Sequence, residues 1–340
     1  MLCFAAGIIM LTTCSKDEPE ASWQKLTAFP GNTKHFATAV YNDDAYLFFG
    51  ERTSLNYSPT VWKYNSEDDK WVELPDFDGT PRSKSTAFAA GGKIIIVGGE
   101  IVTVGSKKEK IDNVLQYDPS NNSWATLNTF PGGATCAGMT FEVNNEIYYG
   151  LGQYDSESEY GRSFWKYKPA TDEWIRLADY PGALPDHYDN FNHFSILYSR
   201  FTRFVVGDKI FLVTGEKFDE PEMWEYASGS NEWTQITDLT FEDDLAQQLF
   251  LVRGGGGCYT HMDKCYLFLG ARLNDWTIGN LFHEFDPVTH QWSIKRDVQS
   301  LPSEIPSVAF IIKTNKTVIF GSDYNDGTVV KGYQLWRFKL

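Results

Sequence analysis

The sequence predicts an all-β protein built from a repeated four-stranded unit. Aromatic residues make up 16% of the 340 residues, and apolar runs that end in Gly recur along the chain. In five places an aromatic residue is followed seven residues later by Trp: Tyr64 and Trp71, Tyr117 and Trp124, Tyr167 and Trp174, Tyr226 and Trp233, and Phe285 and Trp292. Short strands with periodic aromatic and Gly positions indicate a repeated sheet rather than separate domains.

Each unit begins with a strand of small or apolar residues and a tight turn. The expected turns contain Asn, Asp and Gly, which tolerate left-handed backbone: Asn42-Asp-Asp, Gly91-Gly, Asn144-Asn, Gly207-Asp, Asp263-Lys and Asn315-Lys. A very apolar second strand then ends in Gly. The six second strands are residues 46–50, 94–99, 147–150, 210–215, 266–270 and 318–321. A loop, an aromatic strand and a Trp strand complete the unit.

The two ends of the chain complement each other. The Trp strands begin at Trp23, Trp71, Trp124, Trp174, Trp233 and Trp292. No repeat precedes the Trp23 strand, and no Trp strand follows the last aromatic strand, residues 334–338. We therefore expect the N-terminal strand to supply the outer edge of the last sheet and to close a ring.

Four-stranded units at a period near 50 residues, with Gly after the second strand and Trp in the fourth, resemble kelch repeats. The resemblance covers residues 22–340 and implies a six-bladed β-propeller, with the aromatic and Trp residues packing the blades. Only the second unit keeps the kelch Gly-Gly pair, at Gly98 and Gly99. That departure weakens any transfer of subfamily function but not of the fold.

Residues 1–13 form an apolar, uncharged run that is typical of a signal peptide. The run ends in Leu-Thr-Thr-Cys14, which resembles the lipobox of bacterial lipoproteins and implies lipidation at Cys14. No Lys or Arg precedes the run, so the alternatives are an upstream start or a marginal signal. Residues 14–21 then form an acidic tether that resembles a surface-export tag; an ordinary polar tether is the alternative. We expect an outer-membrane lipoprotein at the cell surface, with a periplasm-facing form as the alternative.

Charge and cysteine content limit the partners. The formal net charge of −15 argues against nucleic acid as a partner and is typical of a soluble secreted surface.

We expect Cys136, Cys258 and Cys265 to be small core residues, with a Cys258–Cys265 bridge as the alternative. The spacing of His and Cys residues does not indicate a metal site, and the copper–tyrosyl residues of galactose oxidase have no match in this sequence. We therefore expect no cofactor. We also expect the protein to be a monomer.

Long loops in the fourth and fifth units and the residues after the second-strand Gly predict a binding site at the channel mouth. Carboxylates, Arg and exposed aromatic residues converging there suit a sugar or a peptide, whereas a solvated rim with internal salt bridges is the structural alternative. The candidate ligand-binding residues are Glu51, Arg52, Glu100, Tyr154, His187, His193, Arg200, Arg203, Glu216, Arg253, Arg272 and Trp276.

Two functions remain open. The first is a surface-anchored binding module for a glycan or a protein, which the absence of a recognisable catalytic signature favours. The second is a sugar mutarotase or epimerase, because some six-bladed bacterial kelch-type propellers are sialic-acid mutarotases and this chain is similar to them in size and repeat number. Anomer interconversion needs one acid–base pair, which Glu with Arg or His at the mouth would supply.

Overall fold

A computed structural model describes the chain in nine segments. They are residues 22–154, 161–184, 201–214, 222–243, 257–268, 282–295, 310–313, 318–325 and 330–339. The regular structure in these segments is β-strand throughout. Within them, no helix has the length and apolar character needed to cross a membrane. The predicted all-β class is confirmed.

The first three sheets each contain four antiparallel strands in chain order. The first is formed by β2 (Ala37–Tyr41), β3 (Asp44–Phe48), β6 (Val61–Asn65) and β7 (Lys70–Leu74). The second is formed by β8 (Thr86–Ala90), β9 (Lys93–Val97), β12 (Val114–Asp118) and β13 (Ser123–Thr126). The third is formed by β15 (Met139–Val143), β16 (Glu146–Gly150), β18 (Phe164–Lys168) and β19 (Glu173–Arg176).

The remaining sheets vary this plan. The fourth is formed by β20 (Phe201–Val206), β21 (Lys209–Thr214), β22 (Met223–Ala227) and β23 (Glu232–Gln235). The fifth contains β25 (Gly257–His261), β26 (Lys264–Phe268), β27 (Phe282–Asp286) and β28 (Gln291–Lys295), with β24 (Thr240–Phe241) added in parallel to β28. The sixth contains β29 (Phe310–Lys313), β30 (Val318–Asn325), β31 (Val330–Lys339) and β1 (Ser22–Lys25).

The tight turns before the second strands adopt the left-handed backbone that their sequences favour. Asn42 and Asp43 have φ of 51° and 63°, and Asn144 and Asn145 have φ of 52° and 62°. Two successive residues at positive φ match the right-handed twist of the flanking strands. In the fifth sheet the turn lies at Met262 and Asp263, one residue before the predicted Asp263-Lys turn.

This shifted turn brings two cysteines together, so the expectation of unpaired core cysteines is wrong at this site. His261 pairs with Lys264 across the turn, and Cys258 consequently lies opposite Leu267, two residues from Cys265 on the neighbouring strand. Such diagonal neighbours share one face of a sheet. The structure joins Cys258 and Cys265 in a disulfide, whereas Cys136 is free and buried.

The interval from an aromatic residue to Trp has a direct structural cause. The two residues lie opposite each other in the third and fourth strands of five sheets, as Tyr64 and Trp71 do in the first. Their ring centroids are 4.7–4.9 Å apart. Aromatic pairs at this separation stabilise a sheet beyond their buried area. The predicted packing role of these residues is confirmed.

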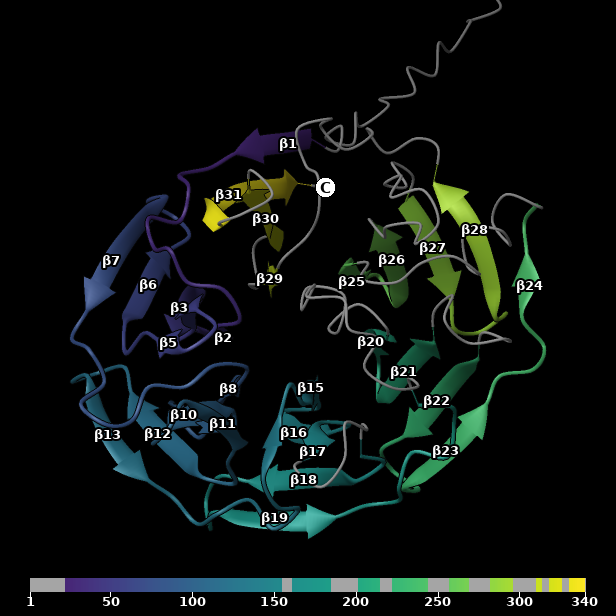
Figure 1. Cartoon of the computed structure of the whole chain (residues 1–340). Helices are drawn as coiled ribbons and strands as arrows, with labels where there is room; N and C mark the ends of the chain where they lie inside the picture. The colour runs from purple at the N-terminus through teal and green to yellow at the C-terminus, as the bar shows by residue number, and fades with distance from the viewer. Residues whose placement is uncertain are drawn as a thin grey trace, which may run out of the picture.

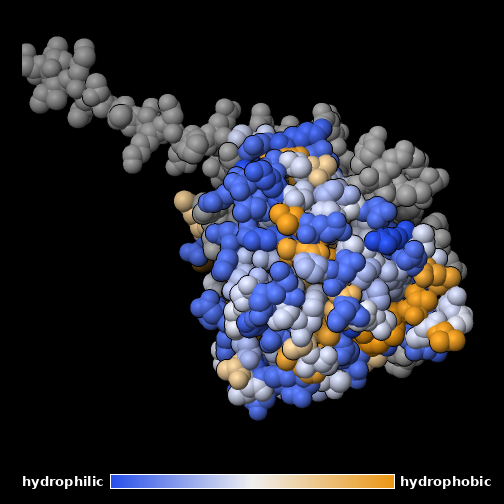
Figure 2. Space-filling view, turned by 90° about the vertical axis from the view of Figure 1, so that its left-hand side faces the viewer, coloured by the Kyte–Doolittle hydropathy of each residue, from blue (hydrophilic) through white to orange (hydrophobic). Residues whose placement is uncertain are grey.

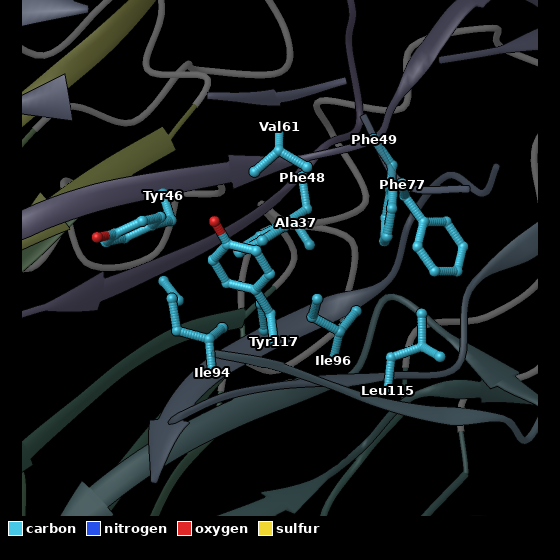
Figure 3. Close-up of a cluster of buried hydrophobic side chains, with 12 residues drawn as sticks. Ala37, Tyr46, Phe48, Phe49, Val61, Phe77, Ile94, Ile96, Leu115 and Tyr117 are labelled. Carbon is cyan, nitrogen blue, oxygen red and sulfur yellow. The ribbon is translucent and has the colours of Figure 1, made fainter. Parts of the chain in front are cut away.

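Hydrophobic clusters fill the space between consecutive sheets. Between the first and second sheets, Tyr46, Phe48 and Val61 face Ile94 and Tyr117 (Figure 3). Corresponding clusters join the second sheet to the third, the third to the fourth, and the fourth to the fifth. The sheets therefore bury their faces against one another, and Figure 1 shows them arranged around a common centre.

The two ends of the chain meet in the sixth sheet. Trp23 of β1 pairs with Phe338 of β31, and their ring centroids are 4.8 Å apart. The side-chain amide of Gln334 donates a hydrogen bond of 2.6 Å to the carbonyl of Leu26. Phe282 of the fifth sheet lies 5.1 Å from Phe338, measured between ring centroids. Figure 1 shows β1 as the outermost strand of this sheet.

The face of the molecule seen in Figure 2 is mostly hydrophilic. Figure 2 views the side that carries β7 and β13, and apolar atoms gather there in one area at the lower right. Among the described residues, the exposed large apolar side chains are Leu55, Val72, Val104, Met262 and Val288. Some exposed apolar residues are normal on a folded protein.

Candidate functional site

Each of the first three sheets carries a short two-stranded ribbon beside the end of its second strand; in the first two sheets both ribbon strands follow the second strand, whereas in the third sheet one ribbon strand precedes the first strand. The ribbons are β4 (Glu51–Thr53) with β5 (Asn56–Tyr57), β10 (Glu100–Thr103) with β11 (Lys107–Lys110), and β14 (Thr135–Cys136) with β17 (Gln153–Tyr154). Glu51, Glu100 and Gln153 therefore occupy equivalent positions. Each is bonded through its backbone to the loop that leads into the innermost strand, as Glu51 is to Lys34.

Those inner loops are joined to one another from sheet to sheet. The backbone N–H of Lys84 donates to the carbonyl of His35 at 2.9 Å, and that of Ala137 donates to the carbonyl of Lys84 at 2.8 Å. All three residues have left-handed backbone, with φ of 55°, 58° and 53°. Sheets that radiate from a centre approach each other most closely at their inner ends, so these positions lie at the inner edge of the sheets.

The side chains at these positions form what we call the Glu51–Glu100 cluster. Its members are His35, Glu51, Tyr57, Lys84, Glu100 and Lys108. The first three come from the first unit and the last three from the second. The cluster therefore spans two units, and its parts lie far apart in the sequence.

Glu51 forms the first half of the cluster with His35. Nδ1 of His35 lies 3.2 Å from Oε2 of Glu51, and the ammonium of Lys34 lies 3.8 Å from Oε1. Burial lowers the pKa of His35 despite the neighbouring carboxylate. Burial alone would raise the pKa of Glu51, but the hydrogen bond and charge of His35 and the charges of Lys34 and Lys108 lower it. Glu51 is therefore ionised beside a neutral imidazole at neutral pH.

Glu100 forms the second half. Lys84 donates to both of its carboxylate oxygens at 3.1 Å, and the hydroxyl of Tyr57 donates to Oε1. The ammonium of Lys108 lies 3.4 Å from the same Oε1. Burial would raise the pKa of Glu100, but the charges of Lys84 and Lys108 and the hydrogen bond from Tyr57 lower it. The carboxylate is thus held ionised by several donors.

Positive charge exceeds negative charge around these carboxylates. The ammonium groups of Lys34, Lys84 and Lys108 face two carboxylates, which leaves one unit of positive charge with His35 neutral. The side chains of Lys34 and Lys108 are 39% and 34% exposed. On a chain with a formal charge of −15, this local surplus suits an anionic ligand.

Arg82 lies two residues before Lys84 and is buried. It is 4% exposed, and its guanidinium lies 5.7 Å from the Phe49 ring centroid and 6.0 Å from that of Phe77. It donates to the carbonyl of Gly98 and to Oδ1 of Asn113. Burial lowers the pKa of Arg82 to about 10. Its contacts hold the loop that carries Lys84 against the end of β9 and the segment that precedes β12.

The structure brings Glu51 and Glu100 together in this cluster, and it also describes three of the other predicted residues. Arg52 is exposed on β4, and Arg203 is half-buried within β20. Tyr154 is half-buried on β17, where its carbonyl accepts a hydrogen bond from Lys110. The remaining predicted residues lie outside the described segments: Cys14, His187, His193, Arg200, Glu216, Arg253, Arg272 and Trp276.

Sequence reasoning missed His35, Tyr57, Lys84 and Lys108. One signal could have found two of them, because His35 precedes Glu51 by 16 residues and Lys84 precedes Glu100 by 16 residues. Ala137 precedes Gln153 by the same interval. The offset is regular even though the residue type changes. Within the described residues, no group of three His, Cys, Asp or Glu could hold a metal ion.

Known proteins give two kinds of match. No protein-family model matches the chain. N-acetylneuraminate epimerase of Haemophilus influenzae (strain 86-028NP) is 24% identical over 262 residues, which cover 65% of this chain and 68% of the relative. Kelch-like protein 35 of Mus musculus is 24% identical over 246 residues, which cover 70% of this chain and 37% of the relative. The chain is thus similar to bacterial epimerases and to kelch-like proteins.

A solved structure shares the fold. The structure of YjhT matches with a TM-score of 0.62 and 16% identity, covering 91% of this chain and 95% of that one. At this identity the likeness shows the fold alone. Together with the sequence relatives, it confirms the predicted resemblance to kelch-type β-propellers.

Proposed function

We propose that this protein is a sugar epimerase of the mutarotase type that acts on N-acetylneuraminate or a related sugar acid. The relatives named N-acetylneuraminate epimerase support the class of substrate. The observation that carries the chemistry is the pair formed by His35 and Glu51, 3.2 Å apart beside surplus ammonium groups. A neutral imidazole oriented by a carboxylate is a suitable proton acceptor.

The exchange of anomers requires two proton movements. A base removes the proton of the anomeric hydroxyl while an acid protonates the ring oxygen, the ring opens, and closure on the other face reverses both transfers. Because Nδ1 of His35 faces the Glu51 carboxylate, it carries the hydrogen, and Nε2 keeps the lone pair that accepts a proton. Lys34 and Lys108 supply N–H donors and attract the sugar carboxylate.

Nuclear magnetic resonance of anomer exchange tests this proposal. Purified protein should accelerate the interconversion of the two anomers of N-acetylneuraminate. His35→Asn should lower the rate about a hundredfold or more, because positioned acid–base groups contribute about that much. His290→Asn is the matched control, since His290 lies in the turn between β27 and β28 of the fifth sheet and also has left-handed backbone. A wild-type rate equal to that of buffer would refute the epimerase.

A binding module for a glycan or an acidic partner is the second candidate. One observation favours it: the neighbours of Glu51 and Glu100 lower the pKa of both, which makes these carboxylates weak proton acceptors. In such a site, a lysine ammonium group leaves its carboxylate partner and pairs with an acidic group of the ligand. Tight binding of N-acetylneuraminate without any exchange of anomers would select this candidate.

We also propose how the sheets close into a ring and where in the cell the protein is located. The pairing of β1 with β31, and the contacts between sheets, support a closed ring of six blades over residues 22–340. The apolar run of residues 1–13 and Leu-Thr-Thr-Cys14 support removal of a signal peptide, lipidation of Cys14 and attachment to the outer membrane through residues 14–21. Mass spectrometry of the N-terminal peptide of the native protein tests the lipidation.

A further inference from the structure

The β10–β11 hairpin carries two adjacent lysines with different surroundings. Successive side chains of a strand point to opposite faces, so Lys107 and Lys108 project from opposite sides of the ribbon. The ammonium of Lys107 pairs with Glu109 at 3.1 Å, and its side chain is 73% exposed. Lys108 turns inward instead: its ammonium lies 3.4 Å from Oε1 of Glu100 and 5.8 Å from the centroid of the Tyr57 ring.

The two lysines that meet Glu100 also differ from each other. Lys84 is 3% exposed and donates to both carboxylate oxygens, so it is a permanent counter-ion. Lys108 is 34% exposed and approaches one oxygen. Without Lys108, Glu100 would still accept hydrogen bonds from Lys84 and Tyr57. Lys108 can therefore move away without leaving a buried carboxylate unpaired, which is the costly outcome for a buried charge.

We propose that Lys108 distinguishes acidic from neutral sugars, because its ammonium leaves Oε1 of Glu100 and binds the carboxylate of the incoming ligand. The assignment rests on the proposed function for the class of ligand. It concerns one residue of the cluster and leaves Lys84 in place. No covalent bond forms or breaks in this exchange.

Moving the Lys108 ammonium from Glu100 to the ligand also changes the proton affinity of the Glu100 carboxylate. Burial raises the pKa of this carboxyl, and Lys108 is one of the charges that lower it. When Lys108 pairs with a ligand carboxylate, its charge is neutralised, and the proton affinity of Glu100 rises in the occupied site.

Titration calorimetry with two probes tests the assignment. The probes are N-acetylneuraminate and its methyl ester, which differ in the charge of the carboxyl group. The wild-type protein should bind the acid more tightly than the ester. Lys108→Met should weaken binding of the acid about tenfold or more, as expected for a lost hydrogen bond between charged groups, and should leave the ester unchanged. Lys108→Arg should retain the preference.

Lys107→Met is the matched control, since it removes the same charge from the other face of the same strand. It should bind both probes as the wild-type protein does. Equal losses for acid and ester in Lys108→Met, or a wild-type protein that binds neither or does not discriminate, would overturn the assignment. Preferential binding of the acid that depends on Lys108, without exchange of anomers, would refute the epimerase and leave the role of Lys108 intact.

Discussion

The hydroxyl of Tyr226 donates a hydrogen bond of 2.9 Å to Oδ1 of Asn231 within the fourth sheet. The same oxygen accepts the backbone N–H of Ala178, which follows the last strand of the third sheet, at 2.9 Å. Asp69 makes the same double contact through Oδ1 in the first sheet, and Asp172 makes it in the third sheet with one carboxylate oxygen for each partner. An Asx residue in left-handed backbone thus connects a sheet both to its own aromatic strand and to the preceding sheet.

We expect Asn231→Ala to lower the free energy of unfolding by about 2–3 kcal/mol. The substitution removes two hydrogen bonds of about 1 kcal/mol each and places Ala in left-handed backbone, where a Cβ is unfavourable. Tyr226→Phe should cost about 1 kcal/mol, because it removes one hydrogen bond and keeps the buried ring. Urea denaturation measures both values. Equal losses for the two variants would contradict the double contact.

The repeated sheets could be predicted from the sequence because each repeated sequence feature arises within one hairpin. Tyr64 and Trp71 are opposite partners in adjacent strands, so a short turn fixes their separation in sequence. The turn residues were readable for the same reason, since Asn42 and Asp43 determine their own backbone. The turn at Met262 was misplaced because the inward-facing positions of Cys265 and Leu267, which are buried, set the register there.

Only part of the candidate site could be predicted from the sequence. Glu51 and Glu100 follow the second-strand Gly and could be identified from the repeat. Their partners come from other loops, and the equivalent inner positions hold His35, Lys84 and Ala137, which share no chemistry. Contacts between units depend on how the sheets pack, and single-sequence periodicity does not encode that arrangement.

Stability should fall in mild acid because of His35. Burial lowers the pKa of His35 below its ordinary value of 6.5, so the unfolded chain takes up a proton first as the pH decreases. The stabilisation is present at neutral pH and is lost as the pH falls below about 6.5. Asn tolerates the left-handed backbone at this position, so the His35→Asn variant should keep the fold. Its stability should depend less on pH in this range.

Thermal unfolding followed by circular dichroism between pH 8 and pH 3 measures this effect. Glu51 and Glu100 also have lowered pKa values, so their contribution is present above the ordinary value of 4.5 and is lost as the pH falls through the folded value. His35→Asn should therefore remove the loss above pH 5 and retain the steeper loss below it. Superimposable curves for the two proteins would show that His35 makes no such contribution.

Lys84→Met should lower the free energy of unfolding by about 3 kcal/mol, because it removes one partner of a buried ion pair. The side chain of Lys84 is 3% exposed and contacts both oxygens of Glu100. Adding Glu100→Gln should restore part of the loss, since two neutral groups tolerate burial better than one unpaired charge. Lys107→Met, on an exposed side chain, should change stability by less than about 0.5 kcal/mol. Additive losses in the double variant would exclude coupling between Lys84 and Glu100.

The proposed ring closure can be tested by linking the two ends of the chain. Ser22 of β1 lies directly opposite Lys339 of β31. Opposite residues of antiparallel strands have Cα atoms about 4.5–5.5 Å apart, which suits a disulfide. We expect the double variant Ser22→Cys with Lys339→Cys to form this bond in high yield under mild oxidation. The product should migrate faster than the reduced chain on a denaturing gel, because the link encloses nearly the whole polypeptide.

Each single variant is a control for pairing with Cys136 or the two cysteines of the fifth sheet. Neither should yield the faster species. The linked protein should also unfold at a higher denaturant concentration than the reduced form, because the bond restricts the unfolded chain, which the chain-entropy relation puts at about 6 kcal/mol for a loop of this size. Failure of the double variant to oxidise, while its native circular dichroism is retained, would mean that β1 does not occupy the outer edge of the sixth sheet in solution. The gel distinguishes these outcomes without reference to any ligand, so the closure of the ring is tested independently of the function of the site.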